Sequence, residues 1–166
     1  MDHDVSDSRE VIQLFEQEYA DLLAGLTAFI KSVPSQLLYQ PPDGANLPDA
    51  TVGENVLKCA AVVEQLFGGL TANLWDDPFE WTLPETLSTS DLVEQYIGEV
   101  DATRKRAFAS FANDGVLLKH IAVPSGESRP LMSLLLETLV RASGYQGRVI
   151  ATRKILSDVG APRFII

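Results

Sequence analysis

The stretch LVRASGYQGRV, residues 139–149, has an unusual composition for the middle of a helix. It lies within residues 131–156, where the apolar spacing predicts one long helix. Polar residues recur through this segment at steps of three or four: Thr138, Arg141, Tyr145, Arg148 and Thr152. Residues at this spacing share one side of a helix, so the sequence predicts a polar stripe along it. Such a stripe indicates either a binding site or the remains of one.

Beside the polar stripe, the same helix carries a line of small residues, Gly144, Gly147 and Ala151. A glycine inside a helix costs about 1 kcal/mol relative to alanine. That cost predicts close approach of another helix, either within the molecule or across a homodimer interface. The apolar residues 164–166 offer further contact surface, and we therefore expect a homodimer.

Composition excludes several classes of partner. The 166 residues carry 23 acidic and 13 basic side chains, a net charge of −10. Nucleic acids and anionic membranes bind clustered cations, so neither is an expected partner. The single cysteine, Cys59, excludes an intramolecular disulfide and is typical of a reducing compartment. The acidic start MDHDVSDSRE lacks the features of a signal peptide, and we expect a cytoplasmic protein.

Four segments have apolar residues at steps of three and four and are bounded by caps, glycines or prolines: residues 7–33, 51–75, 88–113 and 130–160. Capping-box or N-cap spacing opens the first three, at Asp7/Glu10, Thr51/Glu54 and Ser88/Asp91. Residues 116–123 alternate weakly, which favours a short extended excursion before the fourth helix. The pattern predicts an all-α four-helix bundle that forms a single domain over residues 1–166.

The helix order, the start of the second helix and the Pro-Ser-Gly turn before the fourth resemble the DinB-like superfamily of bacterial four-helix bundles. Bacillithiol transferases and mycothiol-dependent isomerases share that fold. The resemblance implies an up-down-down-up arrangement and three metal-binding histidines. Those positions fall on Cys59, within Leu57-Lys58-Cys59-Ala60, and on Arg141 and Tyr145, with Tyr145-Gln146-Gly147-Arg148-Val149 standing for the family motif.

None of the three positions is a histidine here, so the family's metal site is absent from the sequence. A guanidinium is always protonated and cannot ligate a metal. A phenol must lose a proton with a pKa near 10 before it binds a metal well. We therefore expect neither a resident metal nor another cofactor.

Arg141 and Cys59 each have two interpretations. Arg141 is either an arginine at the rim of the bundle or a cation inside the former metal cavity. A buried guanidinium needs a carboxylate, for which Glu64 and Glu18 are the candidates. Cys59 lies on an apolar stripe and is expected to be an inert core residue, unless Arg141 lowers its pKa and makes it a nucleophile.

The candidate pocket consists of Cys59, Glu64, Arg141, Tyr145 and Arg148. Two arginines and a phenol suit a carboxylate or a phosphate group. The leading hypothesis is therefore a bundle that binds a small acidic ligand or serves as a dimeric scaffold. The alternative is a thiol-dependent transferase or isomerase in which arginine and tyrosine act as electrophiles in place of a metal.

Overall fold

The computed structural model describes residues 8–41, 51–78 and 82–156. They form four long helices: α1 (Glu10–Lys31), α2 (Val52–Ala72), α3 (Ser90–Ser110) and α4 (Leu131–Leu156). Between them lie the 3₁₀ turns η1 (Ser35–Leu37) and η3 (Asp114–Leu118) and the strands β1 (His120–Ala122) and β2 (Ser128–Pro130). The predicted all-α bundle is confirmed, with a small two-stranded sheet added. Within the described residues, no helix has the length and apolarity needed to cross a membrane.

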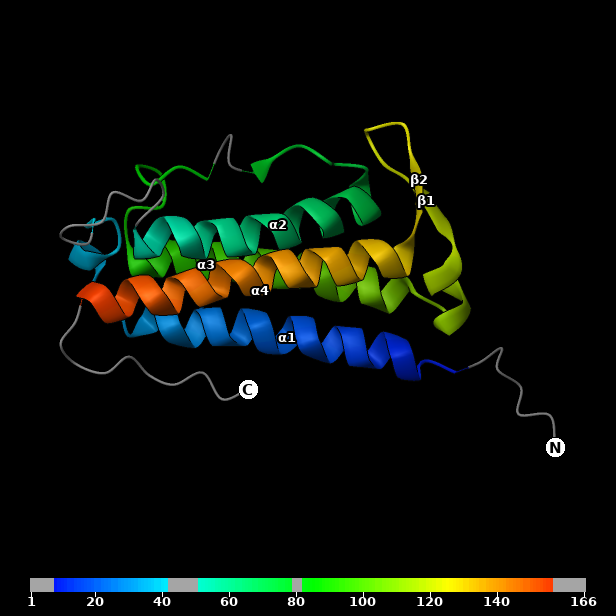
Figure 1. Ribbon diagram of the computed structural model, residues 1–166, viewed down its shortest axis with the longest axis horizontal. Helices are drawn as coiled ribbons and strands as arrows, with labels where there is room; N and C mark the ends of the chain where they lie inside the picture. Colours follow the sequence, from blue (N-terminus) through cyan, green and yellow to red (C-terminus); the bar gives the residue numbers. More distant parts are fainter. Residues whose placement is uncertain (1–7, 42–50, 79–81, 157–166) are drawn as a thin grey trace.

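The helices are arranged with α1 and α2 on opposite sides of the bundle, α4 in front and α3 behind (Figure 1). The end of α1 meets the start of α3, where Lys31 pairs with Glu94 at 2.8 Å, so these two helices are antiparallel. The hydroxyl of Tyr19 donates to the carbonyl of Leu135 at 2.6 Å, so the N-terminal halves of α1 and α4 lie together. Both α2 and α3 run in the opposite direction (Figure 1).

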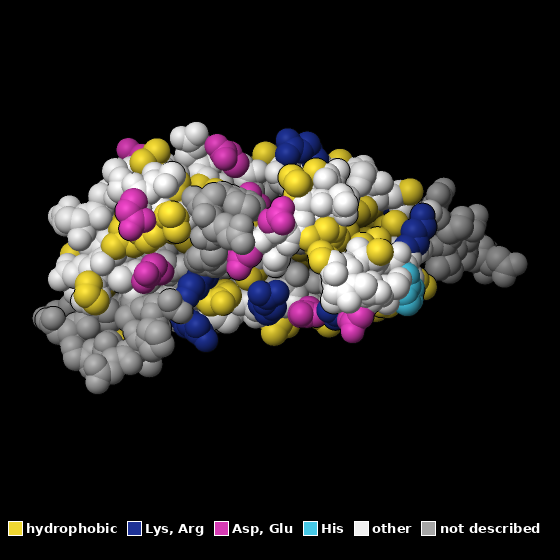
Figure 2. Space-filling view, turned by 90° about the horizontal axis from the view of Figure 1, so that it is seen from above, with side chains coloured by type: hydrophobic (Ala, Val, Ile, Leu, Met, Phe, Trp, Pro, Cys, Tyr) yellow, Lys and Arg dark blue, Asp and Glu magenta, His cyan; other side chains and the backbone are white. Residues whose placement is uncertain are grey.

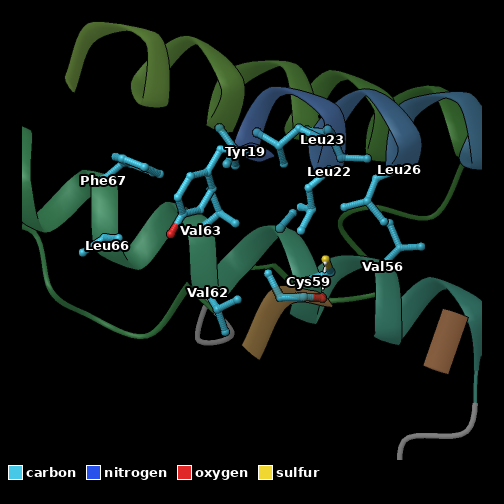
Figure 3. Packing of buried hydrophobic residues seen from close by; sticks show 14 of the residues in the cluster. Tyr19, Leu22, Leu23, Leu26, Val56, Cys59, Val62, Val63, Leu66 and Phe67 are labelled. Carbon is cyan, nitrogen blue, oxygen red and sulfur yellow. Dashed lines mark hydrogen bonds between the residues drawn. The ribbon is translucent and has the colours of Figure 1, made fainter. Parts of the chain in front are cut away.

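Three aromatic side chains from three helices pack at the centre of the core. The Tyr19 ring lies edge-on to that of Phe67, with centroids 5.0 Å apart, and Phe108 lies 5.4 Å from Phe67. All three are fully buried. Figure 3 shows apolar side chains of α1 and α2 facing each other across this core. The core therefore joins α1, α2 and α3 directly.

The predicted capping box at the start of α2 is confirmed. The backbone N–H of Glu54 donates to Thr51 Oγ1 at 3.2 Å, and the backbone N–H of Thr51 donates to Glu54 Oε2 at 3.4 Å. For α3 the cap is Thr89, whose Oγ1 accepts from the N–H of Leu92, one residue later than the predicted Ser88. The helix also ends at Ser110, short of the predicted Asn113.

The N-terminus of α1 is capped by a residue that lies 102 positions later in the chain. Asp7, the predicted cap, lies outside the described residues. Asp114 of η3 accepts hydrogen bonds from the backbone N–H groups of Ile12 at 2.9 Å and Val11 at 3.1 Å. Burial alone would raise the pKa of Asp114, but these bonds and one from Ser8 hold it below its usual value.

The expected extended excursion before α4 is a short hairpin. Its antiparallel strands pair His120 with Pro130 and Ala122 with Ser128. The residues just before it, which were expected to be extended, form η3 instead. Pro130 ends β2, and α4 begins at the next residue as predicted.

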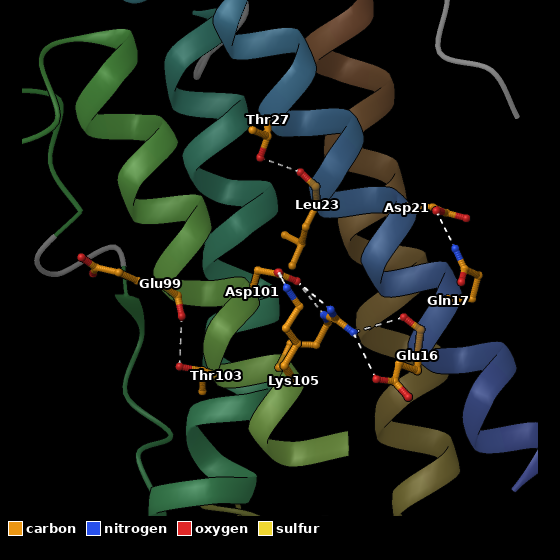
Figure 4. A network of polar contacts seen from close by, with 10 residues as sticks. Glu16, Gln17, Asp21, Leu23, Thr27, Glu99, Asp101, Thr103 and Lys105 are labelled. Atoms are coloured by element: carbon orange, nitrogen blue, oxygen red, sulfur yellow. Dashed lines mark hydrogen bonds and ion pairs between the residues drawn. The ribbon is translucent and has the colours of Figure 1, made fainter. Parts of the chain in front are cut away.

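A buried arginine that the apolar pattern did not predict ties α3 to α1. The side chain of Arg104 is 3% exposed and pairs with Asp101 at 2.8 Å. It also donates to the backbone carbonyl of Glu16 at 3.3 Å. Figure 4 shows Asp101 of α3 and Glu16 of α1, which this network connects. Burial alone would raise the pKa of Asp101, but Lys105 and Arg104 hold it below its usual value. Arg104 is thus a buried cation with its partners in place.

Replacing Arg104 with alanine should lower the free energy of unfolding by about 2–3 kcal/mol, because it leaves a cavity and removes the charge partner of Asp101. Lys105→Ala is the matched control. Lys105 also pairs with Asp101, at 2.7 Å, but is mostly exposed, so its loss should cost about 0.5 kcal/mol. Urea unfolding measures both values, and equal losses would contradict a structural role specific to Arg104.

The cap on α1 predicts a pH dependence. The folded-state pKa of Asp114 is lowered, so its ionised carboxylate stabilises the folded state. This stabilisation is complete above the unfolded-state pKa of about 4 and is lost as pH falls through the folded-state pKa. The Asp114→Asn variant should therefore have a lower melting temperature than the wild type at neutral pH. The difference between the two melting temperatures should narrow below about pH 4. Thermal unfolding followed by circular dichroism tests this, and a difference that stays constant down to pH 2 would contradict it.

Candidate functional site

Cys59 lies inside the interface between α2 and α4. It is fully buried, and its thiol donates to the carbonyl of Ala142 at 3.1 Å. Burial raises the pKa of the thiol to about 12. Cys59 thus lies in the core, as its apolar stripe predicted, and burial disfavours both the access and the thiolate that a nucleophile needs, so its inertness stays a prediction.

Arg141 is exposed and lines a groove on the surface of the bundle. The groove has a volume of about 320 Å³ and lies between the second half of α2, the hairpin and the first half of α4. Its lining residues are Val62, Gln65, Leu66, Trp75, Val123, Pro124, Ser125, Arg129, Leu134, Glu137, Thr138 and Arg141. The rim interpretation of Arg141 therefore fits the structure, and the buried-cavity interpretation does not.

Trp75 forms one wall of the groove and is held in place from two sides. Its ring lies over Gly69, where an added Cβ would come within 2.4 Å of the ring atoms. Its indole N–H donates to Asn73 Oδ1 at 3.0 Å, and Gln65 Nε2 donates to its backbone carbonyl at 3.0 Å. The aromatic wall is therefore fixed before any ligand arrives.

The charges at the groove leave one cation in excess. Arg129 of β2 pairs with Glu137 of α4 at 2.6 Å. Within the described part of the chain, Arg141 has neither an ion pair nor a hydrogen bond. The expected partners lie elsewhere, since Glu18 is exposed on α1 and Glu64 accepts from the hydroxyl of Tyr96 at 2.5 Å. Arg141 thus offers its guanidinium to the groove.

The five residues of the predicted pocket are not gathered in this groove. Arg141 lines it, whereas Cys59 is sealed in the core and Glu64 lies between α2 and α3. Tyr145 is half-buried, and the guanidinium of the exposed Arg148 lies 5.3 Å from the centre of its ring. Burial raises the pKa of Glu64, an effect that the hydrogen bond from Tyr96 partly offsets.

The helix-four glycines face outward. An added Cβ on either Gly144 or Gly147 would meet no atom within 4 Å. The predicted close approach within the bundle therefore does not occur at these two positions, and the expectation of a dimer interface stays a prediction. Residues 164–166, which were expected to add to it, lie outside the described residues.

The face seen from above the bundle mixes hydrophobic side chains with isolated charges of both signs (Figure 2). It therefore offers no extended basic patch of the kind that binds nucleic acid. Among the described residues there is also no group of three or more His, Cys, Asp or Glu side chains placed to hold a metal ion.

Comparison of the chain with protein-family profiles, with curated proteins and with solved structures finds no match. Function is therefore inferred from the chemistry of the groove.

Besides Arg141 and Thr138 of the predicted stripe, four polar residues line the groove that sequence reasoning did not predict: Gln65, Ser125, Arg129 and Glu137. Glu137 precedes Arg141 by four residues, so its place on the same edge of α4 was a detectable signal. Arg129 comes from the hairpin and Gln65 from another helix, and only the tertiary arrangement brings them here.

Native protein should not react with a thiol reagent at neutral pH, because a thiol with a pKa of about 12 is ionised in only about one molecule in 10⁵. One equivalent should react once denaturant opens the core. A timed absorbance assay with an aromatic disulfide reagent measures both. Labelling of the folded protein within seconds would show that Cys59 is accessible and would favour the thiol-dependent alternative.

Proposed function

We propose that this protein is a cytoplasmic DinB-like bundle with an up-down-down-up arrangement that binds a small acidic ligand in the groove lined by Arg141. The helix directions support this arrangement. The observation that carries the function is the guanidinium of Arg141. It lies unpaired among the described residues and lines a groove of about 320 Å³, in a chain of net charge −10.

The chemistry of the groove suits a carboxylate or phosphate attached to an apolar body. A guanidinium donates two parallel hydrogen bonds to either anion. Arg129 is held by Glu137 and adds a second source of positive potential at the same site. Trp75, Leu66 and Leu134 supply apolar walls for the rest of the ligand. The volume falls at the small end of the range for ligand sites, about 300–1,000 Å³.

The thiol-dependent alternative receives less support. Cys59 does not line the groove, and its buried thiol is protonated at neutral pH. Arg141 lies at the surface and is not placed to stabilise a Cys59 thiolate. The dimeric scaffold has a separate basis in the outer face of α4.

A panel of inorganic phosphate, succinate and benzoate tests the groove by isothermal titration calorimetry. At least one anion should bind, and Arg141→Ala should weaken that binding by about 10- to 100-fold, because hydrogen bonds to charged groups contribute about 1.5–3 kcal/mol. Arg106→Ala removes an exposed arginine from α3 and should have no effect. Binding of none of the three, or an equal loss in both variants, would contradict the proposal.

A further inference from the structure

The outer face of α4 is almost free of charge. Eight of its exposed positions between 132 and 151 are uncharged: Met132, Ser133, Leu136, Val140, Ser143, Gly144, Gly147 and Ala151. The exposed charges in this span, Glu137, Arg141 and Arg148, lie at steps of four and seven along one edge. No labelled element lies in front of α4 in Figure 1. A solvent-facing strip of this kind is unusual in a chain with 22% charged residues.

The strip exposes apolar surface that the described residues leave uncovered. Leu136 is 54% exposed and Val140 is 65% exposed, one helical turn apart. The glycines that follow them have open space where a Cβ would stand, so internal packing does not require them. Glycine inside a helix is unfavourable, and it becomes useful where another backbone approaches closely. Both facts indicate a partner against this face.

The order of side-chain sizes along the strip identifies the partner. The bulky residues Met132, Leu136 and Val140 occupy its first half. The small residues Gly144, Gly147 and Ala151 occupy its second half. We propose that the outer face of α4 packs antiparallel against the same face of a second copy of this chain. The two-fold axis passes between Ser143 and Gly144.

In this register two of the three large side chains meet a small one, and the third, Met132, lies opposite the exposed Ile155. Val140 of one copy lies opposite Gly147 of the other, and Leu136 lies opposite Ala151. A parallel arrangement would place Val140 against Val140 and leave the glycines facing each other. Complementary size therefore favours the antiparallel pair, in which small residues let helix axes approach to about 8 Å.

The charged edge agrees with the same register. The two-fold axis keeps the edges that bear Glu137, Arg141 and Arg148 on the same side of the interface. Position 148 of one copy falls opposite position 139 of the other, within one turn of Glu137. Arg148 of each copy therefore lies near Glu137 of the other copy, and symmetry gives two such contacts. In a parallel pair the two-fold axis would run along the helices and would place the two charged edges on opposite sides of the interface, where they could not pair.

The size of the strip predicts weak association. Residues 132–155 span about 35 Å, and a strip about 12 Å wide corresponds to roughly 400 Å² per copy. A total near 800 Å² is below the roughly 1,200–2,000 Å² of stable specific interfaces and fits a weak, transient one, so we expect a dissociation constant in the range of about 10–100 µM. The interface uses the outer face of α4 and does not depend on whether the groove binds a ligand.

Disulfide trapping tests the register. Ser143→Cys stands beside the axis, so its two copies are offset by only about 1.5 Å along the helices and should cross-link rapidly under mild oxidation. Ser133→Cys is equally exposed on the same face, but its two copies are separated by roughly 30 Å and should not cross-link. Failure of Ser143→Cys, or equal cross-linking of both variants, would overturn the antiparallel pairing.

Sedimentation velocity over about 5–500 µM tests the association itself. The wild type should shift from monomer to dimer, and Gly147→Leu should weaken association at least tenfold by filling the space that receives Val140. Gly98→Leu on α3 is the matched control, since a Cβ there also meets no atom within 4 Å, and it should behave as the wild type. A monomer throughout, or equal weakening by both substitutions, would refute the interface.

Discussion

The packing of α4 on α2 is the contact on which the rest of the structure depends. Almost every residue in the first half of α2 is buried, including Cys59, whose thiol reaches the backbone of α4. Beyond its contacts with α2 and α1, α4 has two other surfaces. One edge meets the hairpin and forms the groove, and the outer face is left uncovered by the described residues. Ligand binding and self-association are therefore assigned to different sides of one helix.

Local signals in the sequence were sufficient to predict the helices. The capping box at Thr51 and Glu54 and the proline before α4 mark boundaries through interactions within a few residues, which sequence spacing reveals directly. Contacts between distant segments gave no such signal. Asp114 caps α1 across 102 residues, and no spacing rule connects the two. The burial of Arg104, by contrast, had a local signal in the sequence, because Arg104 follows the apolar Val100 by one turn and so lies on the buried side of α3.

The candidate site shows why a polar stripe is an incomplete guide. The residues on the predicted stripe of α4 straddle the boundary between core and solvent. Thr138 and Thr152 are buried, Tyr145 is half-buried, and Arg141 and Arg148 are exposed. Helical spacing predicts the direction of a side chain around the helix to within about one residue's rotation. That uncertainty is as large as the difference between pointing into the core and pointing into the surface groove. Which of the two occurs depends on how the other helices pack against α4, and a single sequence does not give this packing.

The long-range cap on α1 also bears on the order in which the protein takes shape during synthesis. The first turn of α1 leaves the ribosome early, yet its backbone N–H groups find their acceptor only when η3 has followed more than a hundred residues later. Until then the backbone N–H groups of Val11 and Ile12 lack this acceptor, and an uncapped helix end frays. The first turn of α1 is thus expected to be among the last parts of the bundle to become ordered, although it is synthesised first of the four helices.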